Sequence, residues 1–203
     1  VCAVFRTGND RGDQWPGSRV ISAQKASTAN SFSLEGAYPN AGVGRALSTG
    51  NLYGLVQPGG SLFGLQFSNP VDTSVAYGRD GSPGYAEGQS ARRYGLRNDP
   101  LVGDIPGGVN VFGGGLALYN EAGDLVGAIG VSGDTSCADH IIAWKTRDAI
   151  GLDNIPGGVG DGFVNDNLIL NNPPTPNSFE HPSCGFGEDD IINNLATSHP
   201  IGS

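Results

Sequence analysis

The residues best suited to chemistry in this chain lie in one stretch, GGGLALYNEAGDLVGAIGVSGDTSCADH, at positions 113–140. The stretch places Asp134, Asp139 and His140 at the start of an expected helix, directly after an apolar hairpin. Backbone N–H groups and the dipole of a helix N-terminus favour an anion. The corner therefore predicts binding of a small ligand that carries a carboxylate. A second interpretation stays open, in which the two aspartates supply the negative charge and the corner only caps a helix.

A cation for such a ligand is available at Lys25. Ile21, Lys25, Thr28 and Phe32 recur on one face of a helix expected to run from Ser18 to about Phe32. A lysine on a partly apolar face either extends its ammonium group to solvent or anchors an anion. We expect these groups to bound a small pocket. Its candidate ligand-binding residues are Lys25, Phe112, Gly113, Gly114, Gly115, Asp134, Thr135, Asp139 and His140.

Motifs for catalysis are missing from the sequence. It contains no G-x-S-x-G nucleophile elbow and no H-E-x-x-H pair, and nothing in the spacing brings Ser, His and Asp together as a triad. We therefore assign no catalytic residue and no metal ligand from the residues alone. This favours a binding protein over an enzyme without deciding between them.

Charge and hydropathy exclude two classes of partner. The chain has 203 residues, with 11 Lys and Arg against 20 Asp and Glu, and a net charge of −9. The cations are scattered, whereas binding of nucleic acid needs them clustered to neutralise phosphates. No apolar run reaches the roughly 18 residues of a membrane span. We expect no nucleic-acid partner and no membrane-spanning segment.

Three cysteines bear on the compartment. Cys137 lies at a helix start and Cys184 in a Pro-rich tail, so a disulfide between them would join the tail to the core. Cys2 would remain without a partner, and three free thiols are the alternative. Low charge, polar loops and widely spaced cysteines are typical of a secreted or periplasmic bacterial protein.

The elements that position the corner can be read from turn and strand signals. Residues 1–6 read as a short strand, and a short helix is expected near 50–57. Residues 66–108 are mostly loop. Two strands, VNVFGGGLALYN and DLVGAIGVSG, are joined by the hairpin loop NEAGD.

Glycines and caps refine this picture. In the second strand, Gly127 and Gly130 would let a helix or a ligand approach the sheet closely. Ser136 and Asp139 form a capping-box-like pair at the start of the strongest helix, and Gly151 is the candidate for its end. After residue 152 the chain reads as an extended arm rich in Asn, Pro and Gly.

Together, the segments WPGSRVISAQKASTANSF, FGGGLALYNEAGDLVGAIGVSGDTSCADHIIAW and HPSCG resemble the haem-binding and haem-degrading family. That family includes extracellular haem-sensing proteins and a protein encoded with glycolate utilisation. A similar domain forms the C-terminal part of some corrinoid adenosyltransferases. The resemblance covers roughly residues 1–36 and 105–152. The resemblance implies a helix and a strand before the equivalent of VCAV, and we expect both to be missing here.

The resemblance implies an α+β fold, profilin-like or PAS-like, with an antiparallel sheet of about five strands flanked by helices. It implies a domain over residues 1–152 with a loop insertion at about 66–104, followed by a C-terminal arm over 153–203. It also implies homo-oligomers and haem as the cofactor to expect.

Within the family motif, His140 is the candidate axial ligand of haem iron, and a surface or cap histidine is the alternative. The function expected is binding of haem or another anionic or tetrapyrrole ligand by a secreted or periplasmic protein. Two other functions remain open: an accessory subunit of an oligomeric assembly, and a haem-degrading or redox enzyme.

Overall fold

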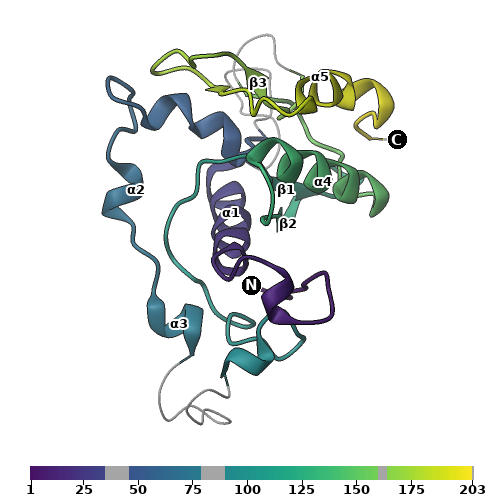
Figure 1. Ribbon diagram of the computed structural model, residues 1–203. Helices are drawn as coiled ribbons and strands as arrows, with labels where there is room; N and C mark the ends of the chain where they lie inside the picture. Colours follow the sequence, from purple (N-terminus) through teal and green to yellow (C-terminus); the bar gives the residue numbers. More distant parts are fainter. Residues whose placement is uncertain (35–45, 79–89, 160–163, 203) are drawn as a thin grey trace.

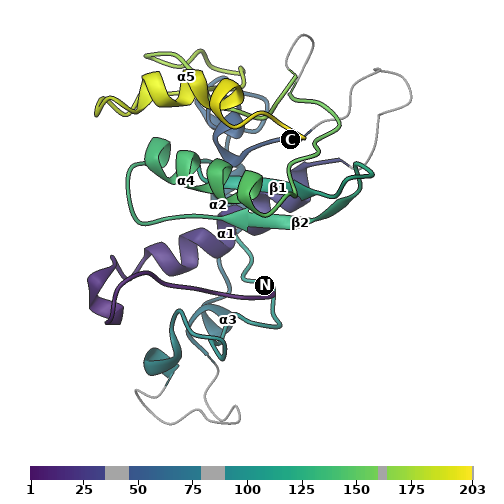
Figure 2. The ribbon, with the colours of Figure 1, turned by 90° about the vertical axis from the view of Figure 1, so that its right-hand side faces the viewer.

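Two helices enclose a hairpin in the computed structural model. Helix α1 (Ser18–Phe32) covers one face of the hairpin and α4 (Ser136–Ala149) covers the other, as Figure 2 shows. Helix α5 (Glu188–Ser198) packs against α4 (Figure 1). The chain is therefore an α+β protein, as its sequence predicts. The structure describes residues 1–34, 46–78, 90–159 and 164–202.

The hairpin forms where the sequence predicts it. Strands β1 (Gly115–Tyr119) and β2 (Leu125–Gly130) pair antiparallel, with a bulge after Leu118. The turn is closed by Gly123, which has a φ of 79° and donates its N–H to the Asn120 carbonyl. A glycine adopts this φ without the steric cost that a Cβ would bring.

The sheet is smaller than expected, and the prediction of about five strands is wrong. Apart from the hairpin, the strands of the described residues are a two-residue parallel pair, β3 (Ile169–Leu170) with β4 (Glu180–His181), and two isolated bridges do not extend into strands. Other groups occupy the outer edge of β1. The Tyr119 N–H donates to the Leu152 carbonyl, and the Arg147 guanidinium donates to the Ala117 carbonyl. The pairing on that edge is thus limited to one isolated bridge, Tyr119 with Asp153, and the Arg147 side chain takes the next carbonyl in place of a further strand.

Residues 1–6 also do not form the expected strand. The Val1 ammonium group donates to the Asp104 carbonyl at 2.7 Å, and the Gly103 N–H donates to the Val1 carbonyl at 2.9 Å. Val4 is buried against Ala23 of α1 and Leu101. Burial of side chains, and not a strand ladder, holds this segment in place.

Helix α1 lies close to the hairpin because of one glycine. A Cβ on Gly130 would overlap the Ser22 carbonyl oxygen and lie 2.7 Å from the Ala26 nitrogen. Nothing lies within 4 Å of a Cβ placed on Gly127. The predicted close approach is thus confirmed for Gly130, where the helix is the neighbour, and not for Gly127.

The segment between α1 and the hairpin contains only short helices. The single helix expected near 50–57 is instead two 3-10 helices, because Gly50 and Gly54 weaken an α-helix there. None of the helices in the described ranges is long and apolar enough to cross a membrane. The short helices are η1 (Arg11–Asp13), η2 (Thr49–Leu52), η3 (Gly54–Val56), α2 (Leu65–Ser68), α3 (Thr73–Tyr77) and η4 (Ser90–Arg93).

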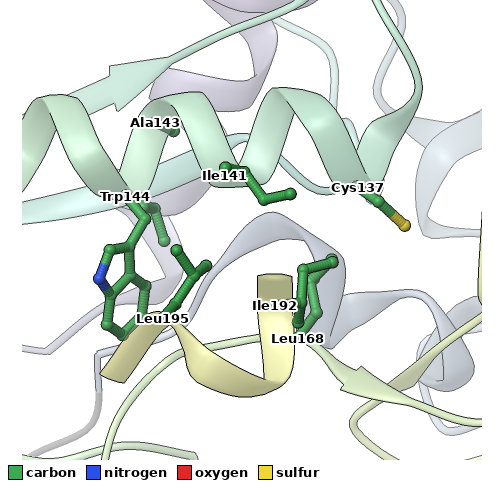
Figure 3. Packing of buried hydrophobic residues seen from close by; sticks show 8 residues of the cluster. Cys137, Ile141, Ala143, Trp144, Leu168, Ile192 and Leu195 are labelled. Carbon is green, nitrogen blue, oxygen red and sulfur yellow. The ribbon is translucent and has the colours of Figure 1, made fainter. Parts of the chain in front are cut away.

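The C-terminal segment contributes to the largest apolar core. Leu168, Ile192 and Leu195 pack against Ile141 and Trp144 of α4, as Figure 3 shows. An ion pair supports this contact: the Arg147 guanidinium donates to both oxygens of Asp166 at 2.7 Å, and both side chains are buried. Asp166, Leu168 and α5 therefore attach the C-terminal segment to the helix that carries the candidate site.

Candidate functional site

The corner at residues 132–140 is a well-capped helix start. Thr135 is the N-cap of α4, and its hydroxyl oxygen accepts a hydrogen bond from the Ala138 N–H at 3.1 Å. The same hydroxyl donates to Glu188 Oε1 at 2.7 Å. The cap is one residue earlier than the predicted Ser136–Asp139 pair, because the Asp139 side chain faces Lys25 instead. Capping uses one of the free N–H groups that an anion would otherwise meet.

Lys25 and Asp139 form a buried ion pair. Lys25 Nζ lies 2.8 Å from Asp139 Oδ2 and donates a second hydrogen bond to the Val131 carbonyl at 2.9 Å. The other carboxylate oxygen, Oδ1, accepts from the Asp134 N–H. Burial lowers the pKa of Lys25 and raises the pKa of Asp139, and each charge opposes the shift of the other. The charge of Lys25 thus has an internal partner.

The three glycines of the predicted pocket are covered by protein. A Cβ on Gly113 would lie 3.1 Å from His140 Cβ, and one on Gly114 would lie 2.8 Å from Asp139 Cβ. A Cβ on Gly115 would lie 2.8 Å from the Thr49 hydroxyl oxygen. These positions are glycine because the start of β1 and the segment before it lie directly against α4 and η2.

The structure brings together only part of the predicted site. Lys25, Gly113–Gly115, Asp139 and His140 pack around one point between α1, β1 and α4. Asp134 is exposed, and its carboxylate accepts the Thr135 N–H. The side chain of Phe112 is 45% exposed and lies on the surface beside Tyr53.

His140 is completely buried, so it is neither a surface nor a cap histidine. Neither ring nitrogen has a hydrogen-bond partner of normal geometry in the described part of the chain. Burial, assisted by the nearby Arg147 charge, lowers the pKa of His140 from 6.5 to about 3. The imidazole is therefore neutral at pH 7, with a nitrogen lone pair available as a donor.

A serine–histidine pair that the sequence did not reveal lies at the same end of α4. Ser136 Oγ is 3.1 Å from His181 Nε2, and His181 Nδ1 is 2.7 Å from the Pro182 carbonyl. The carbonyl only accepts, so Nδ1 carries the proton. Burial lowers the pKa of His181 to about 4, so Nε2 is unprotonated at pH 7 and accepts the Ser136 proton.

A disulfide between Cys137 and Cys184 holds this pair together, as the positions of the cysteines predict. It joins the first turn of α4 to the segment that carries His181. The predicted disulfide was the one signal in the sequence that Ser136 and His181 could meet, because Ser136 precedes Cys137 and His181 lies three residues before Cys184. Cys2 is a free, exposed thiol.

A family model described as haem degrading protein HbpS-like matches residues 4–148, which is most of the chain. The chain belongs to the HbpS-like family. The match contains α1, the hairpin and nearly all of α4. No curated protein and no solved structure matches the chain significantly.

Two residues of this HbpS-like chain, His140 and Lys25, can be compared with the groups that haem requires. Haem iron takes a nitrogen ligand from a neutral imidazole, and neither ring nitrogen of His140 has a hydrogen-bond partner of normal geometry among the described residues. Lys25 does not fit the role of an anchor for a haem carboxylate, because Asp139 already binds its ammonium group. The donor chemistry of the family's ligand is thus present at His140.

Proposed function

We propose that this HbpS-like protein is a secreted or periplasmic module that binds a small ligand, either haem or another anionic or tetrapyrrole molecule. The observation that carries the proposal is His140, a buried neutral histidine whose two ring nitrogens have no partner of normal geometry among the described residues. Leaving polar atoms buried without hydrogen bonds costs stability, so such a group needs an explanation. Use of one nitrogen as a ligand donor supplies that explanation.

In this proposal His140 would hold the iron of haem, and the bound haem would supply a redox-active metal. The chain's own contribution is to keep the imidazole unprotonated and to exclude water from it. The His140 ring lies 6.2 Å from the Trp144 ring, centroid to centroid, and the Asn167 side chain is beside it. Because His140 is enclosed, we expect haem to enter slowly and only after these neighbours move.

A titration with haemin tests the proposal. We expect a Soret band that saturates at a fixed stoichiometry in the wild-type protein and is shifted and weakened in His140→Ala. His199→Ala is the matched control, because His199 is the C-cap of α5 and its ring is bonded to the Ser198 hydroxyl. Circular dichroism would establish that each variant is folded. A His140→Ala variant that is folded and has an unchanged Soret band would contradict the assignment.

The same titration separates the alternatives. Loss of the Soret band after addition of a reductant and oxygen would favour a haem-degrading enzyme. Absence of any saturable band would favour an accessory subunit.

Two further points support the setting of this function. The Cys137–Cys184 disulfide is typical of an oxidising compartment, which supports a periplasmic or extracellular location.

We also propose homo-oligomers. In the described residues β2 pairs only with β1, so its outer edge offers backbone groups to another chain, and Val126 on this strand is 53% exposed. Size-exclusion chromatography with light scattering would report a single monomeric mass if this is wrong.

A further inference from the structure

The hydroxyl group of Ser136 has the surroundings of an activated nucleophile. The Ser136 side chain is half-buried, and its hydroxyl donates to the unprotonated Nε2 of His181. Among the described residues, the hydroxyl also lies 3.5 Å from Cys184 Sγ, which is part of the disulfide and is a weak acceptor. The proton of Ser136 is therefore directed to the histidine.

The histidine is oriented for this role by a third group. The Nδ1–H of His181 donates to the Pro182 carbonyl, which fixes both the tautomer and the plane of the ring. A nucleophile bonded to a base that a third group orients is the general arrangement of serine acyl transfer. The carbonyl here stands where many such enzymes have a carboxylate.

Glycines make room for the pair. A Cβ on Gly50 would lie 3.4 Å from the His181 ring, and one on Gly113 would overlap the Ser136 carbonyl oxygen. Next to Ser136, Thr135 is bonded to Glu188. The segment that carries His181 is attached to α4 by the disulfide of Cys184. The pair is thus held by contacts on both of its segments and does not depend on one flexible side chain.

The helix supplies the electrostatic environment for a developing negative charge. Ser136 is the first residue of α4, a helix of 14 residues. Its own N–H belongs to the first turn, whose amides point toward the N-terminal end and favour an anion there. Of the next two amides, that of Ala138 donates to the Thr135 hydroxyl and that of Cys137 donates to the sulfur of Cys184.

Aromatic side chains lie beside the pair. The Tyr53 ring contacts the His181 ring edge-on at 5.4 Å, and the Phe112 ring lies 6.0 Å from that of Tyr53. Phe112 is 45% exposed, so this aromatic cluster extends from His181 to the solvent. It suits an apolar or aromatic group of a substrate.

We propose that Ser136 and His181 form a catalytic dyad that transfers the acyl group of an apolar carboxylic ester. Ser136 Oγ adds to the ester carbonyl carbon while its proton passes to His181 Nε2. The intermediate expels the alcohol oxygen, which takes that proton, and the acyl group stays on Ser136. Water then attacks the acyl-enzyme in the same way, releases the carboxylic acid and restores the serine. This activity is separate from ligand binding at His140.

A fluorophosphonate probe tests the dyad, because it labels serine hydroxyls that a neighbouring base activates. We expect mass spectrometry to place the label on Ser136 in the folded, haem-free wild-type protein. His181→Gln should lower the labelling rate by about 100-fold or more, the usual range for loss of a general base. Ser136→Ala should abolish the label, and Ser132→Ala, in the same segment but outside the pair, should leave it unchanged.

Hydrolysis of 4-nitrophenyl butyrate gives the second readout. We expect a burst of nitrophenol of about one equivalent per active site, which Ser136→Ala removes. A folded wild-type protein without label on Ser136 would overturn the proposal, as would labelling that His181→Gln does not slow. The hydrogen bond would then serve only to attach the C-terminal segment to α4. Because the probe is used without haem, its result and that of the haemin titration are independent.

Discussion

Lys25 on α1 and Asp139 on α4 are joined by a buried ion pair, with 2.8 Å between Nζ and Oδ2. The two helices lie on opposite faces of the hairpin (Figure 2), so the ion pair connects the two helical layers directly. A lysine that could anchor an external anion is thereby used to join two helices. Its removal should therefore affect stability before it affects binding.

We predict that Lys25→Met lowers the free energy of unfolding by about 3–5 kcal/mol, because it leaves the Asp139 carboxylate buried without its partner. Urea unfolding followed by circular dichroism would measure this. Lys145→Met is the control, since Lys145 is exposed on α4 and should change stability by less than about 0.5 kcal/mol. The double variant Lys25→Met/Asp139→Leu should recover part of the loss. Equal effects at Lys25 and Lys145 would show that the pair contributes little.

The buried histidines predict a loss of stability in acid. The pKa of His140 is about 3 and that of His181 about 4 in the folded protein, against 6.5 when unfolded. Below pH 6.5 the unfolded chain therefore binds more protons than the folded chain. Each histidine should cost up to about 1.4 kcal/mol of unfolding free energy per pH unit, down to its folded pKa. Above pH 6.5 neither contributes a pH dependence.

Urea unfolding at pH 7, 6 and 5 would measure this slope. His140→Phe should reduce it by about one histidine's share. A wild-type protein equally stable at pH 7 and pH 5 would show that the two buried imidazoles become protonated without opening the fold.

The disulfide predicts which peptides are linked and how much the cross-link adds to the free energy of unfolding. Peptide mapping without reductant should recover Cys137 and Cys184 in one linked fragment. Cys137→Ser/Cys184→Ser should lower the free energy of unfolding by about 2–4 kcal/mol, because the cross-link restricts the unfolded chain. It should also slow fluorophosphonate labelling of Ser136. Cys2→Ser is the control and should change neither property; recovery of two separately alkylated peptides would refute the bond.

The pair of Arg147 with Asp166 predicts a local release of the C-terminal segment. Arg147→Met leaves a buried carboxylate unpaired and frees the Ala117 carbonyl. We expect faster proteolysis within residues 164–202, with the hairpin cleaved later. Arg92→Met, on the exposed side of η4, is the control. Cleavage that begins in α1 in both variants would argue that the pair does not hold this segment.

Local signals in the sequence predicted the hairpin, both main helices and the disulfide, since turn glycines, apolar spacing and cysteine position are local properties. The predicted cap at Ser136 was off by one residue. The Thr135 hydroxyl binds Glu188 and the Asp139 carboxylate binds Lys25, and both partners come from distant segments that local sequence does not reveal. The five-stranded sheet failed for a similar reason. Non-strand groups, including Arg147, occupy the edge that another strand would need.

The sequence predicted which residues lie together at the candidate site better than it predicted what each residue does there. Lys25, Asp139 and His140 do lie together, but spacing alone does not show that the lysine is neutralised or that the histidine is enclosed. Ser136 and His181 were missed as a pair because 45 residues separate them. Only the position of the disulfide pointed to their meeting.

The packing of the C-terminal segment on α4 also sets when the protein can fold during its synthesis. A hairpin of two short strands is at best marginally stable by itself. Here its partner helix α4 acquires the Asp166 carboxylate and the Ile192 and Leu195 side chains only from residues made later. A chain still attached to the ribosome before Leu195 has emerged therefore lacks much of its largest core. Folding of this core is completed only once the residues up to Leu195 are available, and until then the apolar strands of the hairpin are prone to aggregation.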